Sequence, residues 1–166
     1  EIHSLEDKGK DLKTRYERAT DQTEKLLRKM SAALEELHKF RVEIGNFRTW
    51  LGRASNVAEE KKQNMVANLS RVSASAEATR EFVSDVIAHQ ADLRFITMAA
   101  QKFISESMEY LGVLNEFRDH LPQRLRHIEP TELMVKAEVA EVTAQYQVIT
   151  LFANRIRRLS CNVLSL

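Results

Sequence analysis

The chain has 166 residues, of which 43% are hydrophobic and 30% are charged, with only four glycines and two prolines, a composition typical of helical proteins. Its formal net charge of +1 excludes the strong positive field expected of a protein that binds nucleic acid or an anionic membrane. A single cysteine, Cys161, excludes an internal disulfide framework and favours a reducing, cytoplasmic environment. The sequence contains no run of about 18 apolar residues, so it predicts no membrane span. Because the sequence lacks an initiator methionine and a signal peptide, we expect a piece of a longer protein.

The first predicted helix begins near Ser4 and continues to about Lys62. From Leu12 to Ala58 its apolar residues recur at alternating steps of four and three, and only Thr23 in this series is clearly polar. A strict period of 3.5 residues is the pattern of a helix that supercoils left-handedly with partner helices. At about 1.5 Å per residue the stretch would span roughly 70 Å, which is longer than a compact domain of this size needs.

Two glycines lie off this apolar series, and a polar stretch follows it. Gly45 and Gly52 each cost about 1 kcal/mol relative to alanine in a helix, so they are either tolerated, or allow a bend, or mark a close approach of neighbouring segments. The stretch from Gln63 to Ser75 is rich in Asn and Ser, loses the apolar pattern and is predicted to be a loop. It contains a formal glycosylation sequence, Asn68-Leu69-Ser70, which has little weight without a secretory signal.

Two further helices are predicted in the rest of the chain. The second covers Thr79–Leu121, again with apolar steps of three and four, and ends at a proline. After a connection over Pro122–Glu129, the third starts at Pro130, a residue that suits a first helical turn. Its apolar series runs over Val135–Val163. Short connections make neighbouring helices antiparallel, so the sequence predicts an all-α bundle in which three helices bury their apolar seams together.

The two ends of the chain are similar to each other. Tyr16 aligns with Tyr146 and Leu26 with Ile156, at an offset of about 130 residues. This match explains the unequal helix lengths, because the front half of the first helix would be the last helix of a preceding unit. We therefore divide the chain into residues 1–35, which are a partial preceding repeat, and residues 36–166, which form one complete, extended repeat.

A family resemblance supports this division. The segment Phe47-Arg48-Thr49-Trp50-Leu51, with Ala33-Leu34 and Phe40 before it, resembles the junction between two spectrin repeats, a family with an aromatic and Trp-Leu element in the first helix of each repeat. The similarity continues in the later helices at Leu93-Arg94-Phe95-Ile96, Gln101-Lys102-Phe103-Ile104, Leu121-Pro122, Val139-Ala140-Glu141-Val142 and Tyr146-Gln147. These segments are most similar to the rod repeats of plakins and spectraplakins.

The resemblance implies an elongated left-handed three-helix bundle of the spectrin-repeat type, whose very long first helix is continuous with the preceding repeat. The offset of about 130 residues exceeds an ordinary repeat of this family, and the surplus falls in the second helix and the connection after it. The implied structural core residues are Phe40, Phe47, Trp50, Leu51, Phe82, Leu93, Ile96, Phe103, Tyr110, Val142, Tyr146 and Ile149.

No arrangement of residues predicts a catalytic, cofactor-binding or metal site, and we expect that the chain is not an enzyme. The five histidines are scattered without acidic or cysteine partners at metal-ligand spacing. His89 lies on the second apolar series, where it is either a satisfied core histidine or a pH-sensitive packing residue. Arg155, Arg157 and Arg158 cluster in the last turns of the third helix. They either interact with the C-terminal helix dipole or bind an acidic protein partner.

We expect a structural rod or spacer module of a large cytoskeletal linker, located in the cytoplasm and offering a docking surface. The resemblance implies adjacent repeats of the same chain and proteins of the cytoskeleton or cell junctions as partners. One alternative is a membrane-shaping dimer of the BAR type, which the low net charge and the acidic second helix disfavour. Another is an adhesion or trafficking module that docks a foreign helix. We expect a monomer, with self-association through Leu12 to Met30 as the competing outcome.

Overall fold

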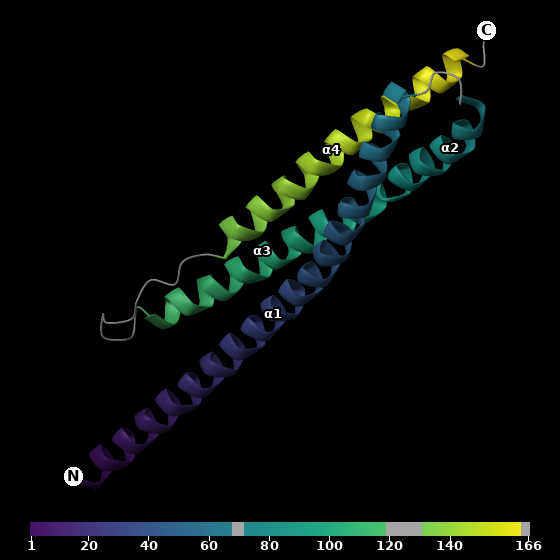
Figure 1. Cartoon of the computed structure of the whole chain (residues 1–166). Coiled ribbons are helices and arrows are strands. Elements are labelled where there is room, and N and C mark those ends of the chain that lie inside the picture. The colour runs from purple at the N-terminus through teal and green to yellow at the C-terminus, as the bar shows by residue number, and fades with distance from the viewer. Residues whose placement is uncertain (68–71, 119–130, 164–166) are drawn as a thin grey trace.

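The computed structural model describes residues 1–67, 72–118 and 131–163, and the regular structure in these ranges is helical. The helices are α1 (Ile2–Ala67), α2 (Val72–Ala88), α3 (Gln90–Arg118) and α4 (Glu132–Val163). α1 runs one way along the molecule, α2 and α3 together run back, and α4 runs in the same direction as α1 (Figure 1). None of the helices in these ranges is long and apolar enough to cross a membrane.

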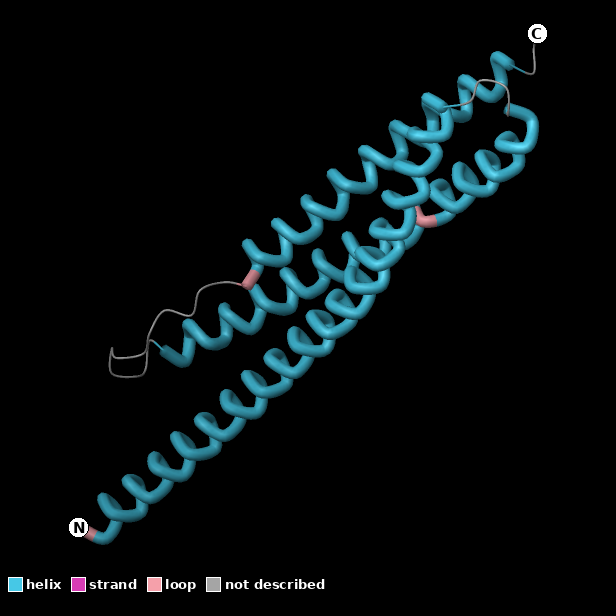
Figure 2. The backbone as a smooth tube through the Cα atoms, in the orientation of Figure 1, coloured by secondary structure: helices cyan, strands magenta, loops and turns pink. Residues whose placement is uncertain are grey.

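The helices pack as the three legs of an elongated bundle, with α2 and α3 forming one leg (Figure 2). α1 packs most extensively against α3, and α4 contacts α2, α1 and α3. Each helix buries the face on which its apolar residues recur every three or four positions, because such residues lie on one side of a helix. The predicted all-helical bundle of three packed legs with a long first helix is confirmed.

One continuous core lies along the centre of the bundle. Its buried residues fall within 33–54 of α1, 82–103 of α2 and α3, and 135–156 of α4. Phe40, Ile96 and Val142 are completely buried. The three legs therefore share a single core, which begins about half-way along α1.

The first part of α1 extends beyond the other helices (Figure 1). All residues from Glu1 to Asp21 are exposed, including the seam residues Leu12, at 67%, and Tyr16, at 74%. Leu26 is half-buried, and the first buried seam residue is Ala33. No described segment covers the front of the α1 seam.

The predicted loop from Gln63 to Ser75 is wrong over most of its length, since α1 continues to Ala67 and α2 already begins at Val72. Asn and Ser lower helix propensity by well under about 1 kcal/mol each, which is too little to end a helix without Gly or Pro. The sequence Asn68-Leu69-Ser70 and the connection predicted over 122–129 lie outside the described residues.

The predicted single second helix is interrupted at His89, which separates α2 from α3 (Figure 2). The backbone hydrogen bonds flanking this residue are kept: the His89 N–H donates to the Asp85 carbonyl and the Leu93 N–H donates to the His89 carbonyl, each over 3.2 Å. The chain therefore passes from α2 to α3 through one residue, without a longer loop.

Gly45 and Gly52 both lie at exposed positions of α1. Apart from the backbone of the helix itself, nothing described lies within 4 Å of the place that a Cβ atom would take at either glycine. The interpretation that they mark a close approach of neighbouring segments is therefore wrong, and the helix tolerates them.

Candidate functional site

A polar cluster lies where α2 passes into α3, in the middle of the bundle. Trp50 of α1 is buried, and its indole N–H donates a hydrogen bond to the Asp85 carboxylate of α2, with 2.8 Å between Nε1 and Oδ2. The His89 ring stacks on the indole with 3.9 Å between ring centroids and 8° between planes. α1 is thus fixed to the second leg at the position of the helix break.

The half-buried His89 ring faces oxygen atoms on both of its nitrogens. Nδ1 lies 2.8 Å from the Asp85 carbonyl oxygen and 3.3 Å from Oδ1 of the same residue. Nδ1 therefore faces a backbone and a carboxylate oxygen of the same residue. Nε2 lies 3.7 Å from Oδ2 of Asp92, beyond hydrogen-bond distance. The ring is therefore held by stacking on Trp50 and by the contacts of Nδ1 with Asp85.

Tyr146 of α4 joins the third leg to the same place. Its hydroxyl donates to the Val86 carbonyl over 2.7 Å, three residues before the break at His89. Its ring packs against Phe47 and Trp50, with centroid distances of 5.9 and 6.1 Å. Burial raises the pKa of the Tyr146 phenol, so the hydroxyl remains a donor. Side chains from all three legs meet at this break.

A second buried polar group, Glu36, lies where the exposed front of α1 enters the bundle. It is 7% exposed and accepts hydrogen bonds from Lys102 of α3, over 2.8 Å, and from Lys39 of α1, over 3.1 Å. The Lys102 ammonium lowers the pKa of Glu36, burial opposes this and Lys39 adds to it. Glu36 was not among the residues predicted to be buried, although its position directly before the seam residue Leu37 is a signal for it.

Ion pairs connect α1 to both other legs. Arg48 of α1 contacts Glu138 and Glu141 of α4 at 3.2 and 3.0 Å, and Arg41 also pairs with Glu138. Lys29 of α1 pairs with Glu109 of α3. The basic side chains of α1 thus draw acidic side chains of α3 and α4 toward the α1 side of the bundle.

The predicted core residues lie largely in the core. Leu93 and Tyr110 are half-buried, and the buried ones are Phe40, Phe47, Trp50, Leu51, Phe82, Ile96, Phe103, Val142, Tyr146 and Ile149. The structure brings Phe47, Trp50 and Tyr146 into one aromatic cluster.

The three predicted partner-binding arginines are exposed on α4. None of Arg155, Arg157 and Arg158 makes an ion pair with another residue in the described part of the chain. α4 continues to Val163, and its last turn contains no basic residue. Because the dipole effect is confined to the last turn, the helix dipole explains these arginines poorly.

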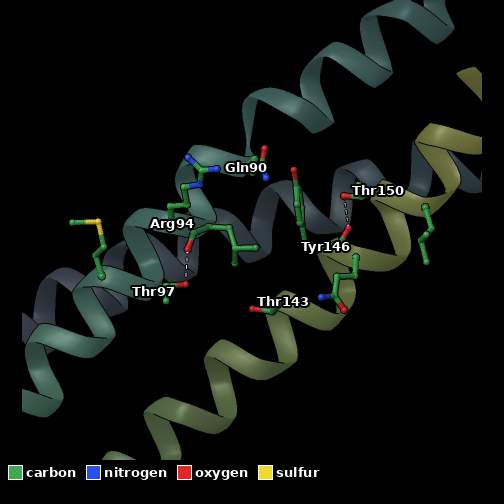
Figure 3. Close-up of a pocket in the computed structure, with 10 residues that line it drawn as sticks. Gln90, Arg94, Thr97, Thr143, Tyr146 and Thr150 are labelled. Carbon is green, nitrogen blue, oxygen red and sulfur yellow. Dashed lines mark hydrogen bonds between the residues drawn. The ribbon is translucent and has the colours of Figure 1, made fainter.

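An open groove of about 740 Å³ lies between α3 and α4 (Figure 3). Gln90, Arg94 and Thr97 of α3 and Thr143, Tyr146 and Thr150 of α4 contribute polar side chains to its lining. Arg94 is the only charged residue in the described part of this lining, which therefore offers a contact surface and no acid–base pair. Within the described ranges, no group of three or more His, Cys, Asp or Glu side chains could hold a metal ion.

Comparison with known proteins identifies the family. A family model described as "Desmoplakin-like, Spectrin domain" matches residues 1–155. The rat protein Microtubule-actin cross-linking factor 1 is 27% identical over 153 residues, and its human counterpart, isoforms 1/2/3/4/5, is 29% identical over 151 residues. Each alignment covers 88% of this chain and 2% of the relative, so the chain spans about a fiftieth of their length. No solved structure matches the chain.

The family model covers the front of α1 and the whole described bundle up to residue 155. The predicted resemblance to spectrin repeats of plakins and spectraplakins is confirmed, because the relatives are spectraplakins at distant similarity. The match is to a family of structural, non-enzymatic domains. The chain belongs to the family of desmoplakin-like spectrin domains.

Proposed function

We propose that this domain is a stiff spacer in the rod of a cytoskeletal linker, and that residues 1–35 form the last helix of the preceding repeat. The observation that carries the proposal is the continuity of α1, a single helix from Ile2 to Ala67 whose front is exposed and whose second half is core. At about 1.5 Å per residue such a helix is roughly 100 Å long. The similarity to a protein named for cross-linking microtubules and actin supports a cytoplasmic, cytoskeletal setting.

Contacts at the junction support stiffness. Lys29 pairs with Glu109, and the buried Glu36 accepts from Lys102, so α1 is fixed to α3 on both sides of the proposed boundary. Bending an unbroken helix at this point would break backbone hydrogen bonds as well as these contacts. Serial repeats joined in this way would keep a constant spacing between binding domains elsewhere in the protein.

The membrane-shaping alternative has less support. A BAR-type dimer needs a free basic face toward anionic lipid. Arg41 and Arg48, in the centre of α1, instead pair with Glu138 and Glu141 of the same chain. The proposed partners are therefore adjacent repeats and proteins of the cytoskeleton or cell junctions.

A distance across the junction tests the spacer role. We would attach spin labels in the Cys161→Ser background at Lys25→Cys and Arg53→Cys, both exposed positions of α1, and measure pulsed dipolar coupling. A stiff helix gives a narrow distribution near about 42 Å. The control pair Glu43→Cys and Glu59→Cys, inside the bundle, should give about 24 Å. A broad distribution for the first pair alone would contradict the spacer role.

Small-angle scattering with a molar mass separates the alternatives in solution. A monomeric rod of roughly 100 Å, the length of α1, agrees with the proposed spacer. A curved dimer of about twice that length would instead support a membrane-shaping or helix-exchanging module.

A further inference from the structure

The α3–α4 groove differs in charge from the α1 side of the bundle. Toward α1, Glu109 of α3 pairs with Lys29, and Glu138 and Glu141 of α4 pair with Arg48. Among the described residues that line the groove, none is acidic and Arg94 is the only charged one. Three acidic side chains of α3 and α4 are thus directed toward α1, whereas the charge in the described groove lining is positive.

The positive charge continues beyond the groove along α4. Arg157 and Arg158 lie two helical turns after the lining residues Thr150 and Leu151, and residues seven apart share one face of a helix. Like Arg94, they are exposed and make no ion pair with any other described residue. A row of unpaired arginines therefore follows the groove toward the end of α4.

Apolar side chains form much of the groove. Leu93 is half-buried and Tyr146 is buried, and both connect the groove to the core. Met98 and Leu151 also line it and remain 62% and 70% exposed. Large apolar side chains beside a concave surface are typical of a docking site, and methionine adapts readily to different partners.

We propose that the α3–α4 groove docks an acidic amphipathic helix of a partner protein. The partner's apolar stripe would pack on Leu93, Met98 and Leu151, and its carboxylates would pair with the row of arginines. Charge complementarity favours this occupant over the exposed front of α1 from a second copy, in which acidic and basic residues alternate between Glu6 and Lys29. The proposal does not depend on the spacer role.

A designed peptide provides the probe. It has about 21 residues, leucines spaced at i, i+3, i+4 and i+7, glutamate at most other positions, and a fluorescein label. We expect saturable, salt-sensitive binding by fluorescence anisotropy. A scrambled peptide of the same composition, and a version with lysine in place of glutamate, should each bind at least about tenfold more weakly.

Matched variants locate the site on the bundle. Arg94→Glu and Leu151→Glu, each at an exposed position, should raise the Kd of the peptide at least about tenfold. Arg53→Glu makes the same substitution and Val42→Glu a similar apolar-to-glutamate substitution at exposed positions of α1, and both should change the Kd less than about twofold. Circular dichroism and melting temperatures check that all four variants are folded.

Several results would overturn the proposal. These are no binding, equal binding of the scrambled peptide, or equal losses in the groove and control variants. Tighter binding to phosphatidylserine vesicles than to the peptide, lost in Arg94→Glu, would assign the groove to a membrane surface. A dimer in sedimentation equilibrium that Leu151→Glu abolishes would make a second copy the occupant.

Discussion

Two aromatic residues combine a buried ring with a satisfied polar atom at the break of the second leg. The Trp50 N–H donates to Asp85, and the Tyr146 hydroxyl donates to the Val86 carbonyl. Among the described residues, no buried side-chain nitrogen or oxygen lacks a hydrogen-bond partner. A buried polar atom without a partner is costly, so both hydrogen bonds must be kept when the helices pack. The two residues therefore fix α1 and α4 relative to α2 through these bonds, and their rings add contact area.

The Tyr146 hydroxyl is the first group to test. Tyr146→Phe keeps the ring but leaves the Val86 carbonyl without this donor, so we expect a loss of about 1–2 kcal/mol in the free energy of unfolding. Urea denaturation followed by circular dichroism measures it. Tyr16→Phe, which removes a hydroxyl from an exposed ring, should change stability by less than about 0.5 kcal/mol. Equal effects of the two substitutions would show that the bond to Val86 is not stabilising.

The buried carboxylate of Glu36 should make the free energy of unfolding depend on pH. Its pKa is lower in the folded chain than its ordinary value of 4.5, chiefly because Lys102 donates to it. The ionised carboxylate therefore stabilises the fold above that ordinary value, and this stabilisation is lost as the pH falls through the folded-state pKa. We expect a contribution of about 1 kcal/mol at neutral pH, since both lysines are at least half exposed and partly screened.

The measurement compares unfolding free energies at pH 7 and pH 3. Glu36→Gln should lose less stability on acidification than the unaltered chain, because it has no carboxylate to protonate at this position. Glu35→Gln, at the adjacent exposed position, is the control and should behave like the unaltered chain. Identical acid losses in Glu36→Gln and the unaltered chain would contradict the role given to this carboxylate.

At the scale of the helices, the spacing of apolar residues was the reliable signal. The period of 3.5 predicted which faces of α1, α3 and α4 are buried, because that spacing places side chains on one side of a helix. The break at His89 was not predictable in this way. It is accompanied by contacts to Trp50 and Tyr146, which lie far away in the sequence. Local composition also failed at residues 63–67 and 72–75, which are helical although polar residues are frequent there.

The glycines of α1 offer a test of helix propensity alone. Gly45→Ala and Gly52→Ala should each stabilise the chain by about 0.5–1 kcal/mol, because both sites are helical, exposed and open around the added methyl group. Thermal and urea unfolding of the two variants and of the double variant measure this, with additive gains expected. Destabilisation at either site would mean that another chain segment packs closely against that glycine.

At the scale of the whole molecule, the lateral arrangement of the helices creates what the sequence did not predict. The α3–α4 groove depends on which helices are neighbours, and a heptad pattern alone does not specify this. The cluster of Arg155, Arg157 and Arg158 was visible in the sequence. That this cluster continues the positive charge of Arg94 depends on α3 and α4 lying side by side, which the sequence did not show.

Removing residues 1–25 tests how the two parts of the molecule share stability. These residues are exposed except for a half-buried Gln22, whereas the core begins at Ala33. A helix without tertiary packing adds little to stability, and repeat domains gain it from contacts with neighbouring units. We therefore expect the truncated chain to unfold within about 1 kcal/mol of the full chain, with a similar urea dependence. A loss of more than about 2 kcal/mol would show that the front of α1 is already packed in solution, and a concentration-dependent loss would identify a second copy as its partner.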